Sequence, residues 1–288
     1  MAINNLAGAP ARALPRRLAL LALLALLSGC AQVVGTGRSQ LSLVSDAEIN
    51  QQSALAYRQT VAEGRLSSNR ADTATIKRVG QRIAQAAQLL MASEGREAEL
   101  AGYAWEFNLL ESDDINAFCM PGGKVAFYSA ILPVCQDDNG IAVVMGHEVA
   151  HALARHGAER VSQQMAAQFG GNVLGAVIGQ TSMGSSTAQM VMIGYGLGAQ
   201  FGVLMPFSRT QEAEADRIGL SLMAIAGYDP EAAVGFWGRM EQATGRTSGS
   251  DFFSTHPSNP ARIQNIRTYI PEAQEKARAL NSAVPARR

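Results

Sequence analysis

The sequence predicts an α+β fold that is mostly helical, with a small antiparallel sheet beside a helix that carries two histidines. Apolar residues recur every three to four positions between 72 and 92, which indicates an amphipathic helix. Residues 103–110 alternate between apolar and polar side chains and are rich in aromatics, a pattern typical of a strand. Residues 116–119 and 124–128 also look like strands, and the proline and glycines of residues 120–123 predict a tight turn between them.

Two further helices have start signals. Ser45 followed by Glu48 is the pattern of a capping box. Asp137 and Asp138 precede the helix with the histidines, where acidic side chains cap free N–H groups and suit the helix dipole. That helix also has an apolar side, which predicts a buried and rigid support: Ile141, Val144, Met145, Val149, Ala152 and Leu153.

The strongest chemical signal is the motif His147-Glu148-x-x-His151. Two histidines four residues apart share one face of a helix, so both can bind a single metal ion. Glu148 lies about a quarter-turn away, where its carboxylate can take a proton from an attacking water without binding the metal. The motif therefore predicts one zinc ion per chain, held by His147 and His151, with Glu148 as the general base.

A catalytic zinc takes three protein ligands and leaves one position open. In one large class of enzymes the third ligand is a histidine six residues after the second, but Gly157 stands there in this chain. His156, one residue short of that position, is interpreted as structural. The third ligand must come from further along the chain.

Glu212 is the best candidate for that ligand. Asp216 lies one turn later on the same helix face, where it can orient a ligating histidine. The alternative is an ordinary acidic first turn of a surface helix, with Glu214 and Arg217 exposed.

Several motifs together resemble one family, the membrane-associated zinc metallopeptidases of the gluzincin group that include the CAAX prenyl proteases, HtpX and the Oma-type proteases. The resemblance covers about residues 46–270 and rests on His147-Glu148-x-x-His151, Phe207-Ser208-Arg209 leading into Glu212-x-x-x-Asp216, Asn116-Ala117-Phe118, Pro121-Gly122-Gly123 and Thr255-His256-Pro257. It implies a zincin-like metallopeptidase domain at 46–270. The short periplasmic lipoprotein members (LoiP-like) are the most similar. The chain departs from the integral-membrane members because it shows no clear transmembrane helix after the leader.

The resemblance also implies a function. We expect a zinc-dependent endopeptidase of the cell envelope that acts in protein quality control on unfolded, misfolded or membrane-associated polypeptides, with the outer-membrane assembly machinery as a further partner. The alternative from another class is a zinc-stabilised periplasmic chaperone or assembly factor with little proteolytic activity.

Residues 1–29 have the parts of a secretory signal peptide: a basic start, a leucine-rich run too short to span a bilayer, and Leu-Ser-Gly before Cys30. This end resembles the lipobox of bacterial lipoproteins, which implies that Cys30 is lipidated. Ala31 resembles the outer-membrane sorting pattern of Gram-negative bacteria. We therefore expect a lipid anchor at the periplasmic face of the outer membrane, with residues 30–45 as a tether. An ordinary signal peptide is the alternative.

The charge balance argues against a nucleic-acid partner. Without Arg12, Arg16 and Arg17 of the leader, the chain has three fewer basic than acidic residues, whereas nucleic-acid binding requires a basic face. Charge is absent altogether from residues 161–208. We expect this segment to form a helical hairpin that covers the active-site cleft or rests on the membrane, and a transmembrane hairpin is the alternative.

Four further residues have open roles. His256 either lies on a surface loop or closes over the cleft, where it stabilises the oxyanion or fills the fourth zinc position. Arg262 is a candidate partner for a carboxylate near the site. Cys119 and Cys135 either form a disulfide, which an oxidising compartment permits, or remain buried thiols. No function is assigned to the C-terminal tail, residues 271–288.

Overall fold

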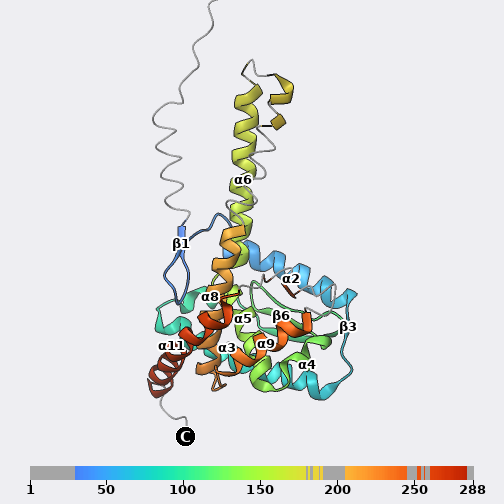
Figure 1. The fold of residues 1–288 in the computed structure, drawn as a ribbon, viewed down its shortest axis with the longest axis vertical. Helices are drawn as coiled ribbons and strands as arrows, with labels where there is room; N and C mark the ends of the chain where they lie inside the picture. The colour runs from blue at the N-terminus through green and yellow to red at the C-terminus, as the bar shows by residue number, and fades with distance from the viewer. Residues whose placement is uncertain are drawn as a thin grey trace, which may run out of the picture.

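A computed structural model describes residues 30–179, 181, 184–187, 189–190, 205–244, 252–253, 256 and 260–283. It has the predicted α+β class and is mostly helical. The strands form one four-stranded sheet and one two-stranded sheet, and one long helix stands out from the body (Figure 1). In chain order the elements are β1 (Cys30–Gln32), β2 (Ser39–Leu41), α2 (Asp46–Glu63), β3 (Arg65–Leu66), α3 (Arg70–Ser93), η1 (Glu97–Leu100), β4 (Glu106–Glu111), β5 (Ala117–Met120), β6 (Lys124–Tyr128), η2 (Ser129–Ile131), α4 (Leu132–Cys135), α5 (Asp138–Leu153), α6 (His156–Gly179), α8 (Met205–Ile225), α9 (Ala232–Thr244) and α11 (Arg262–Ala283).

The predicted start signals are confirmed. Ser45 and Glu48 form a complete capping box at the start of α2, in which each side chain meets the backbone of the other residue. Asp137 caps α5 by accepting a hydrogen bond from the amide of Gly140 at 2.9 Å. The apolar stripe of α3 is also confirmed, because its members are all buried in the core: Ile76, Val79, Ile83, Ala86 and Leu90.

The sheet is mixed, not purely antiparallel as the sequence predicted. Its strand order is β3-β4-β6-β5, with β4 and β6 parallel and the other two pairs antiparallel. From β4 the chain passes to the edge strand β5, and then returns through the predicted turn to place β6 in the middle. Gly122 and Gly123 have φ angles of 82° and 80°, which L side chains rarely adopt, so this turn requires glycine.

Helices α5 and α8 cross with their backbones in contact. A Cβ atom on Gly146 would lie 2.8 Å from the carbonyl oxygen of Gly219, and one on Gly219 would lie 2.9 Å from backbone atoms of Gly146 and His147. Real Cβ atoms do not come that close, so both positions require glycine. This crossing brings the histidine face of α5 directly against α8.

The segment predicted as a tether, residues 30–45, is instead docked on the body. Its β1–β2 hairpin places Val33 and Val34 in the main core. The Gln40 side chain donates to the carbonyl of Ala154 at 2.9 Å, and the Leu43 amide donates to the hydroxyl of Ser162 at 2.8 Å. Its content of Gly, Ser and Thr suggested a spacer, but two adjacent buried valines anchor it to the body.

The predicted C-terminal tail is also largely part of the fold. Helix α11 continues from Arg262 to Ala283, through Pro271, and packs along α8 with Ala273 and Ala277 buried. Alanine gave little sign of burial in the sequence, yet its small side chain suits a close helix contact.

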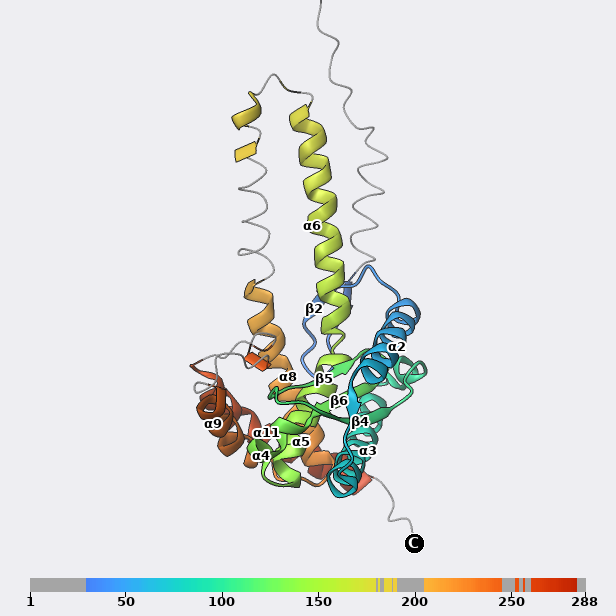
Figure 2. The ribbon, with the colours of Figure 1, turned by 90° about the vertical axis from the view of Figure 1, so that its right-hand side faces the viewer.

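Helix α6 rises from the body next to the N-terminal part of α8 and carries much of the uncharged segment (Figure 2). It extends away from the body, so this part of the segment does not cover the cleft. Some of its apolar side chains are exposed: Val161, Met165, Phe169 and Val173. None of the helices in the described part of the chain is long and apolar enough to span a membrane. Residues 191–204 of the predicted hairpin lie outside the described residues.

The cysteines in the described chain are free thiols. Cys119 lies on β5, while Cys135 ends α4 and is completely buried. The disulfide considered from the sequence is therefore not formed in this structure. Burial raises the pKa of both thiols, so both remain protonated at neutral pH.

Candidate metal centre

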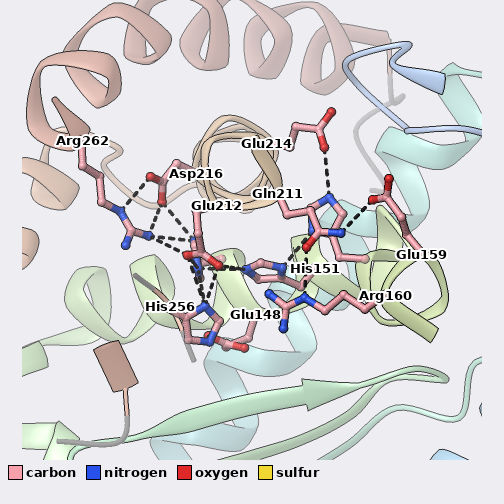
Figure 3. Close-up of polar contacts among 12 residues, drawn as sticks. Glu148, His151, Glu159, Arg160, Gln211, Glu212, Glu214, Asp216, His256 and Arg262 are labelled. Atoms are coloured by element: carbon pink, nitrogen blue, oxygen red, sulfur yellow. Dashed lines mark hydrogen bonds and ion pairs between the residues drawn. The ribbon is translucent and has the colours of Figure 1, made fainter. Parts of the chain in front are cut away.

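The predicted metal ligands meet between α5 and α8. His147 and His151 project from one face of α5, as their spacing predicted. Glu212 faces them from α8, and Figure 3 shows it opposite His151. One ligand atom from each of these residues and one from His256 all lie within 4.8 Å of one another. Chain segments more than 100 residues apart thus supply one cluster of nitrogen and oxygen donors.

The atoms of this cluster are spaced closely enough to share one ion. The Nε2 atoms of His147 and His151 lie 3.1 Å apart, and each lies 3.3 Å from an oxygen of Glu212. Two imidazoles and a carboxylate form the ligand set of a well-known type of catalytic zinc site. The residues therefore fit a zinc ion.

The electrostatics of the cluster also favour a cation. Burial lowers the pKa of His151 far below its usual value, so its imidazole is neutral, as a metal ligand must be. Burial acts to raise the pKa of Glu212, but His151, His147 and His256 outweigh it and hold that carboxylate ionised. Burial lowers the pKa of His147, yet hydrogen bonds with Asp216 and Glu212 raise it to about 9. The pocket thus attracts positive charge.

Asp216 contacts His147, one of the predicted metal ligands. Its Oδ1 atom lies 3.0 Å from Nδ1 of His147, which leaves Nε2 of that ring directed at the cluster. Arg262 is the partner of this carboxylate. Its Nε and Nη2 atoms donate to the two Asp216 oxygens at 2.8 and 2.7 Å, and its guanidinium lies 3.3 Å from the ring centre of Trp237.

Glu148 is buried beside the cluster but outside it. Among the residues that the structure describes, its Oε1 atom has no hydrogen-bond partner, and it lies 3.4 Å from Nε2 of His256. Burial raises the pKa of this carboxyl, and the neighbouring His256 and His147 oppose the rise. A carboxyl with a raised pKa and an oxygen without a hydrogen-bond partner is suited to exchange protons with a reactant.

His256 is buried beside the predicted ligands, so the surface-loop interpretation is wrong. Its Nδ1 atom is 3.1 Å from an oxygen of Glu212 and 3.3 Å from Nε2 of His147, and its ring stacks on Phe252. The position of Nδ1 among the ligand atoms matches the expected fourth position at rest.

A second polar network, which sequence reasoning missed, lies on the other side of the cluster. His156 is interpreted from the sequence as structural, but its Nδ1 atom lies 2.9 Å from Nδ1 of His151. Its Nε2 atom lies 3.2 Å from Glu214. Glu214 is only 7 % exposed and also accepts hydrogen bonds from Arg38 and Thr36, so the alternative of a surface glutamate is wrong.

One signal in the sequence could have suggested this network. Arg38 is the only basic residue between positions 18 and 57, in a stretch of small and apolar residues. An isolated arginine in such surroundings calls for a carboxylate partner. In the structure it also pairs with Glu159 of α6, whose carboxylate accepts a further hydrogen bond from Gln211 of α8.

Comparisons with known proteins agree with this geometry. Residues 70–270 match the model of peptidase family M48. The mitochondrial metalloendopeptidase OMA1 of Schizosaccharomyces pombe is 39% identical over 173 residues, which are 60% of this chain and 48% of that protein. The mitochondrial metalloendopeptidase OMA1 of Danio rerio is 31% identical over 246 residues, or 83% of this chain and 50% of that protein. The beta-barrel assembly-enhancing protease of Escherichia coli K12 is 30% identical over 166 residues, or 57% and 34%. The chain thus spans half or less of the length of these relatives.

Proposed function

Because the chain belongs to peptidase family M48, we propose that it is a zinc-dependent endopeptidase that degrades misfolded or membrane-associated proteins in the cell envelope. The observation that carries this proposal is the convergence of His147, His151 and Glu212 on one point, with Glu148 buried beside them. Two of the relatives are named metalloendopeptidases, which supports the reaction class.

His147, His151 and Glu212 would hold the ion. A bound zinc ion would polarise the scissile carbonyl and lower the pKa of the attacking water. Asp216 fixes the ring of His147 by accepting from its Nδ1, so that Nε2 stays directed at the cluster.

Glu148 would carry the proton. Its unpartnered Oε1 accepts the proton of the attacking water and then delivers it to the leaving amine. Burial favours this exchange because it raises the pKa of the carboxyl toward neutrality. His256 Nδ1 occupies the space among the ligand atoms that a substrate carbonyl needs, so His256 must move before a substrate can bind productively. Once displaced, it is placed to stabilise the oxyanion.

The edge strand β5 offers a binding surface for an extended substrate. Only β6 pairs with it in the described sheet, and β5 packs beside α5, the helix that carries the histidines. An extended peptide that adds to this edge would form backbone hydrogen bonds largely independent of its sequence. Such binding suits the recognition of unfolded polypeptides.

The variant Glu148→Gln tests the reaction. We expect it to retain one tightly bound zinc per chain and to cleave an unfolded model protein at least about 100-fold more slowly than the wild type, because a general base contributes about 10²- to 10⁴-fold. Zinc content by mass spectrometry and cleavage by gel assay are the measurements. Unchanged cleavage by the zinc-loaded variant would exclude this mechanism. Full complementation of a deletion strain by the variant would instead favour a chaperone or assembly factor.

We further propose that Cys30 is lipidated and holds the protein at the periplasmic face of the outer membrane of a Gram-negative bacterium. The lipobox-like sequence before Cys30 supports this location, and Cys30 is exposed. The name of the beta-barrel assembly-enhancing protease makes the outer-membrane assembly machinery a candidate partner. We expect Cys30→Ala to shift the protein from the membrane to the soluble fraction and to change its mature mass. Unchanged fractionation and mass would remove the lipid anchor.

A further inference from the structure

The N-terminal hairpin is connected to the metal centre through side chains with no assigned role. We propose that His156, held by Glu214, positions the metal ligand His151, and that Thr36 and Arg38 of the hairpin hold Glu214 in place. The proposal rests on the proposed function only in taking His151 as a metal ligand. It makes residues just after Cys30 part of the support of the site.

The contacts between His151, His156 and Glu214 fix which ring nitrogens carry hydrogen. His151 directs Nε2 at the other ligand atoms, so as a neutral ligand it carries its proton on Nδ1. That Nδ1 lies 2.9 Å from Nδ1 of His156, which must therefore accept the hydrogen bond. The proton of His156 is then on Nε2, which donates to Glu214 at 3.2 Å. The carboxylate of Glu214, which can only accept, thus selects one tautomer for both rings.

Burial protects the contact between His156 and His151 from water. His156 is 1 % exposed, so bulk water cannot easily replace its contact with His151. Metal-ligating histidines usually donate their second N–H to a carboxylate, a carbonyl or water, and this donation fixes the ring orientation. His151 reaches its carboxylate through a second imidazole instead. His156 does not belong to the cluster of ligand atoms in the described chain, so positioning is the role that fits it.

The N-terminal hairpin supplies the side chains that hold Glu214. Glu214 Oε1 accepts from Nε of Arg38 at 2.8 Å and from the hydroxyl of Thr36 at 2.9 Å, which leaves Oε2 for His156. The two Nη atoms of Arg38 bind Glu159 at 2.7 and 2.8 Å. Arg38 thus pairs with two buried carboxylates and fixes the orientation of Glu214. The hairpin closes the chain of contacts that ends at His151.

The test measures metal binding in a Glu148→Gln background, so that peptide cleavage plays no part. His156→Phe keeps a ring but offers no acceptor to His151. His156→Asn places its Oδ1 atom where Nδ1 of the histidine was, and can therefore accept the same hydrogen bond. We expect zinc affinity, measured by competition with a chromophoric chelator, to fall about 10- to 100-fold in His156→Phe and to recover in large part in His156→Asn. The cobalt(II) absorption spectrum should change in His156→Phe and return toward that of the parent in His156→Asn.

Arg38→Ala extends the test to the hairpin, with Arg217→Ala as its matched control. Arg217 of α8 also pairs with a glutamate, Glu272 of α11, and that glutamate is not one of the predicted metal ligands. We expect Arg38→Ala to weaken zinc binding several-fold and Arg217→Ala to leave it unchanged. Should His156→Phe not fold, Arg38→Ala and Glu214→Gln carry the test by the same two readouts.

Two failures remain distinguishable. Zinc affinity within twofold of the parent protein and an unchanged cobalt spectrum in folded His156→Phe would overturn the positioning role while leaving the proposed reaction intact. Equal losses in His156→Phe and His156→Asn would also overturn it, because they would show a general packing role. Absence of zinc binding in the parent protein would contradict the proposed function itself.

Discussion

The two histidines of α5 are held from opposite sides and in different ways. His147 meets Asp216 directly, and Arg262 at the start of α11 binds both oxygens of that carboxylate. His151 reaches Glu214 only through His156, and the arginine behind Glu214 comes from the N-terminal hairpin. Helix α8 supplies both carboxylates. Glu214 and Asp216 reach opposite sides of the centre because residues two apart face nearly opposite sides of a helix.

The two arginines differ most in their surroundings. The side chain of Arg262 is 6 % exposed and lies over Trp237, whereas that of Arg38 is 20 % exposed. The Arg262 side is therefore sealed in the core, while the Arg38 side borders solvent. His147 is therefore supported from the core and His151 from a peripheral element, so the two supports can be weakened separately.

The largest effect is expected at Arg262. Arg262→Ala leaves the Asp216 carboxylate buried without its guanidinium, so the free energy of unfolding of the metal-free protein should fall by about 3–5 kcal/mol. Urea denaturation in the presence of a chelator measures this loss. A loss below about 1 kcal/mol would mean that the sealed side tolerates an unpaired carboxylate, and the contrast between the two sides would fail.

A smaller loss is expected at Arg38. Arg38→Ala removes hydrogen bonds from Glu214 and Glu159, but nearby water can partly replace them, so the loss should be about 1–3 kcal/mol in the same assay. A loss as large as that of Arg262→Ala would show that the hairpin side is as sealed as the other.

The loss of stability in Arg38→Ala should depend on pH. Burial acts to raise the pKa of Glu214, but hydrogen bonds from His156, Arg38 and Thr36 outweigh it and lower the pKa to about 2 from its usual 4.5. A group whose pKa is lowered by folding stabilises the fold above its unfolded pKa, and this stabilisation is lost as the pH falls toward the folded pKa. The stability difference between wild type and Arg38→Ala should therefore be full above about pH 5 and shrink from pH 4.5 toward pH 2. A difference that grows on acidification would contradict this assignment.

The smallest effect is expected at Arg217. Its pair with Glu272 has a short distance of 2.9 Å, but both side chains are more than a third exposed. Exposed pairs contribute about 0–1 kcal/mol, so Arg217→Ala should change the free energy of unfolding by less than about 1 kcal/mol. A loss that matches that of Arg38→Ala would show that an exposed ion pair supports the fold as much as the partly buried pair of Arg38 does.

Local patterns in the sequence predicted much of the site. Helical spacing placed His147 and His151 on one face and Glu212 with Asp216 on another, and the structure brings these faces together. Capping at Ser45 and Asp137 was predictable because it depends on neighbours within one turn. Each of these features is set by residues close together in the chain.

The rest depends on contacts between distant residues. The patterns of residues 103–110 and 124–128 predict strands, but not that β4 and β6 pair in parallel, because strand order is set by the path of the whole chain. Arg38 and Glu214 are 176 residues apart, and no periodicity connects them. His156 looked structural for the same reason, since its partner Glu214 lies on another helix.

The crossing of α5 and α8 sets the dimensions of the whole centre. Packed helices ordinarily keep their axes about 8–10 Å apart, a spacing that depends on the side chains at the contact. Here Gly146 and Gly219 have no side chain at the contact, and His147 is the next residue along α5. The donor atoms come from both helices and lie within 4.8 Å, so a change in the spacing between the axes changes the size of the ion that fits. The absence of side chains at Gly146 and Gly219 thus sets how closely the donor atoms of the two helices approach one another.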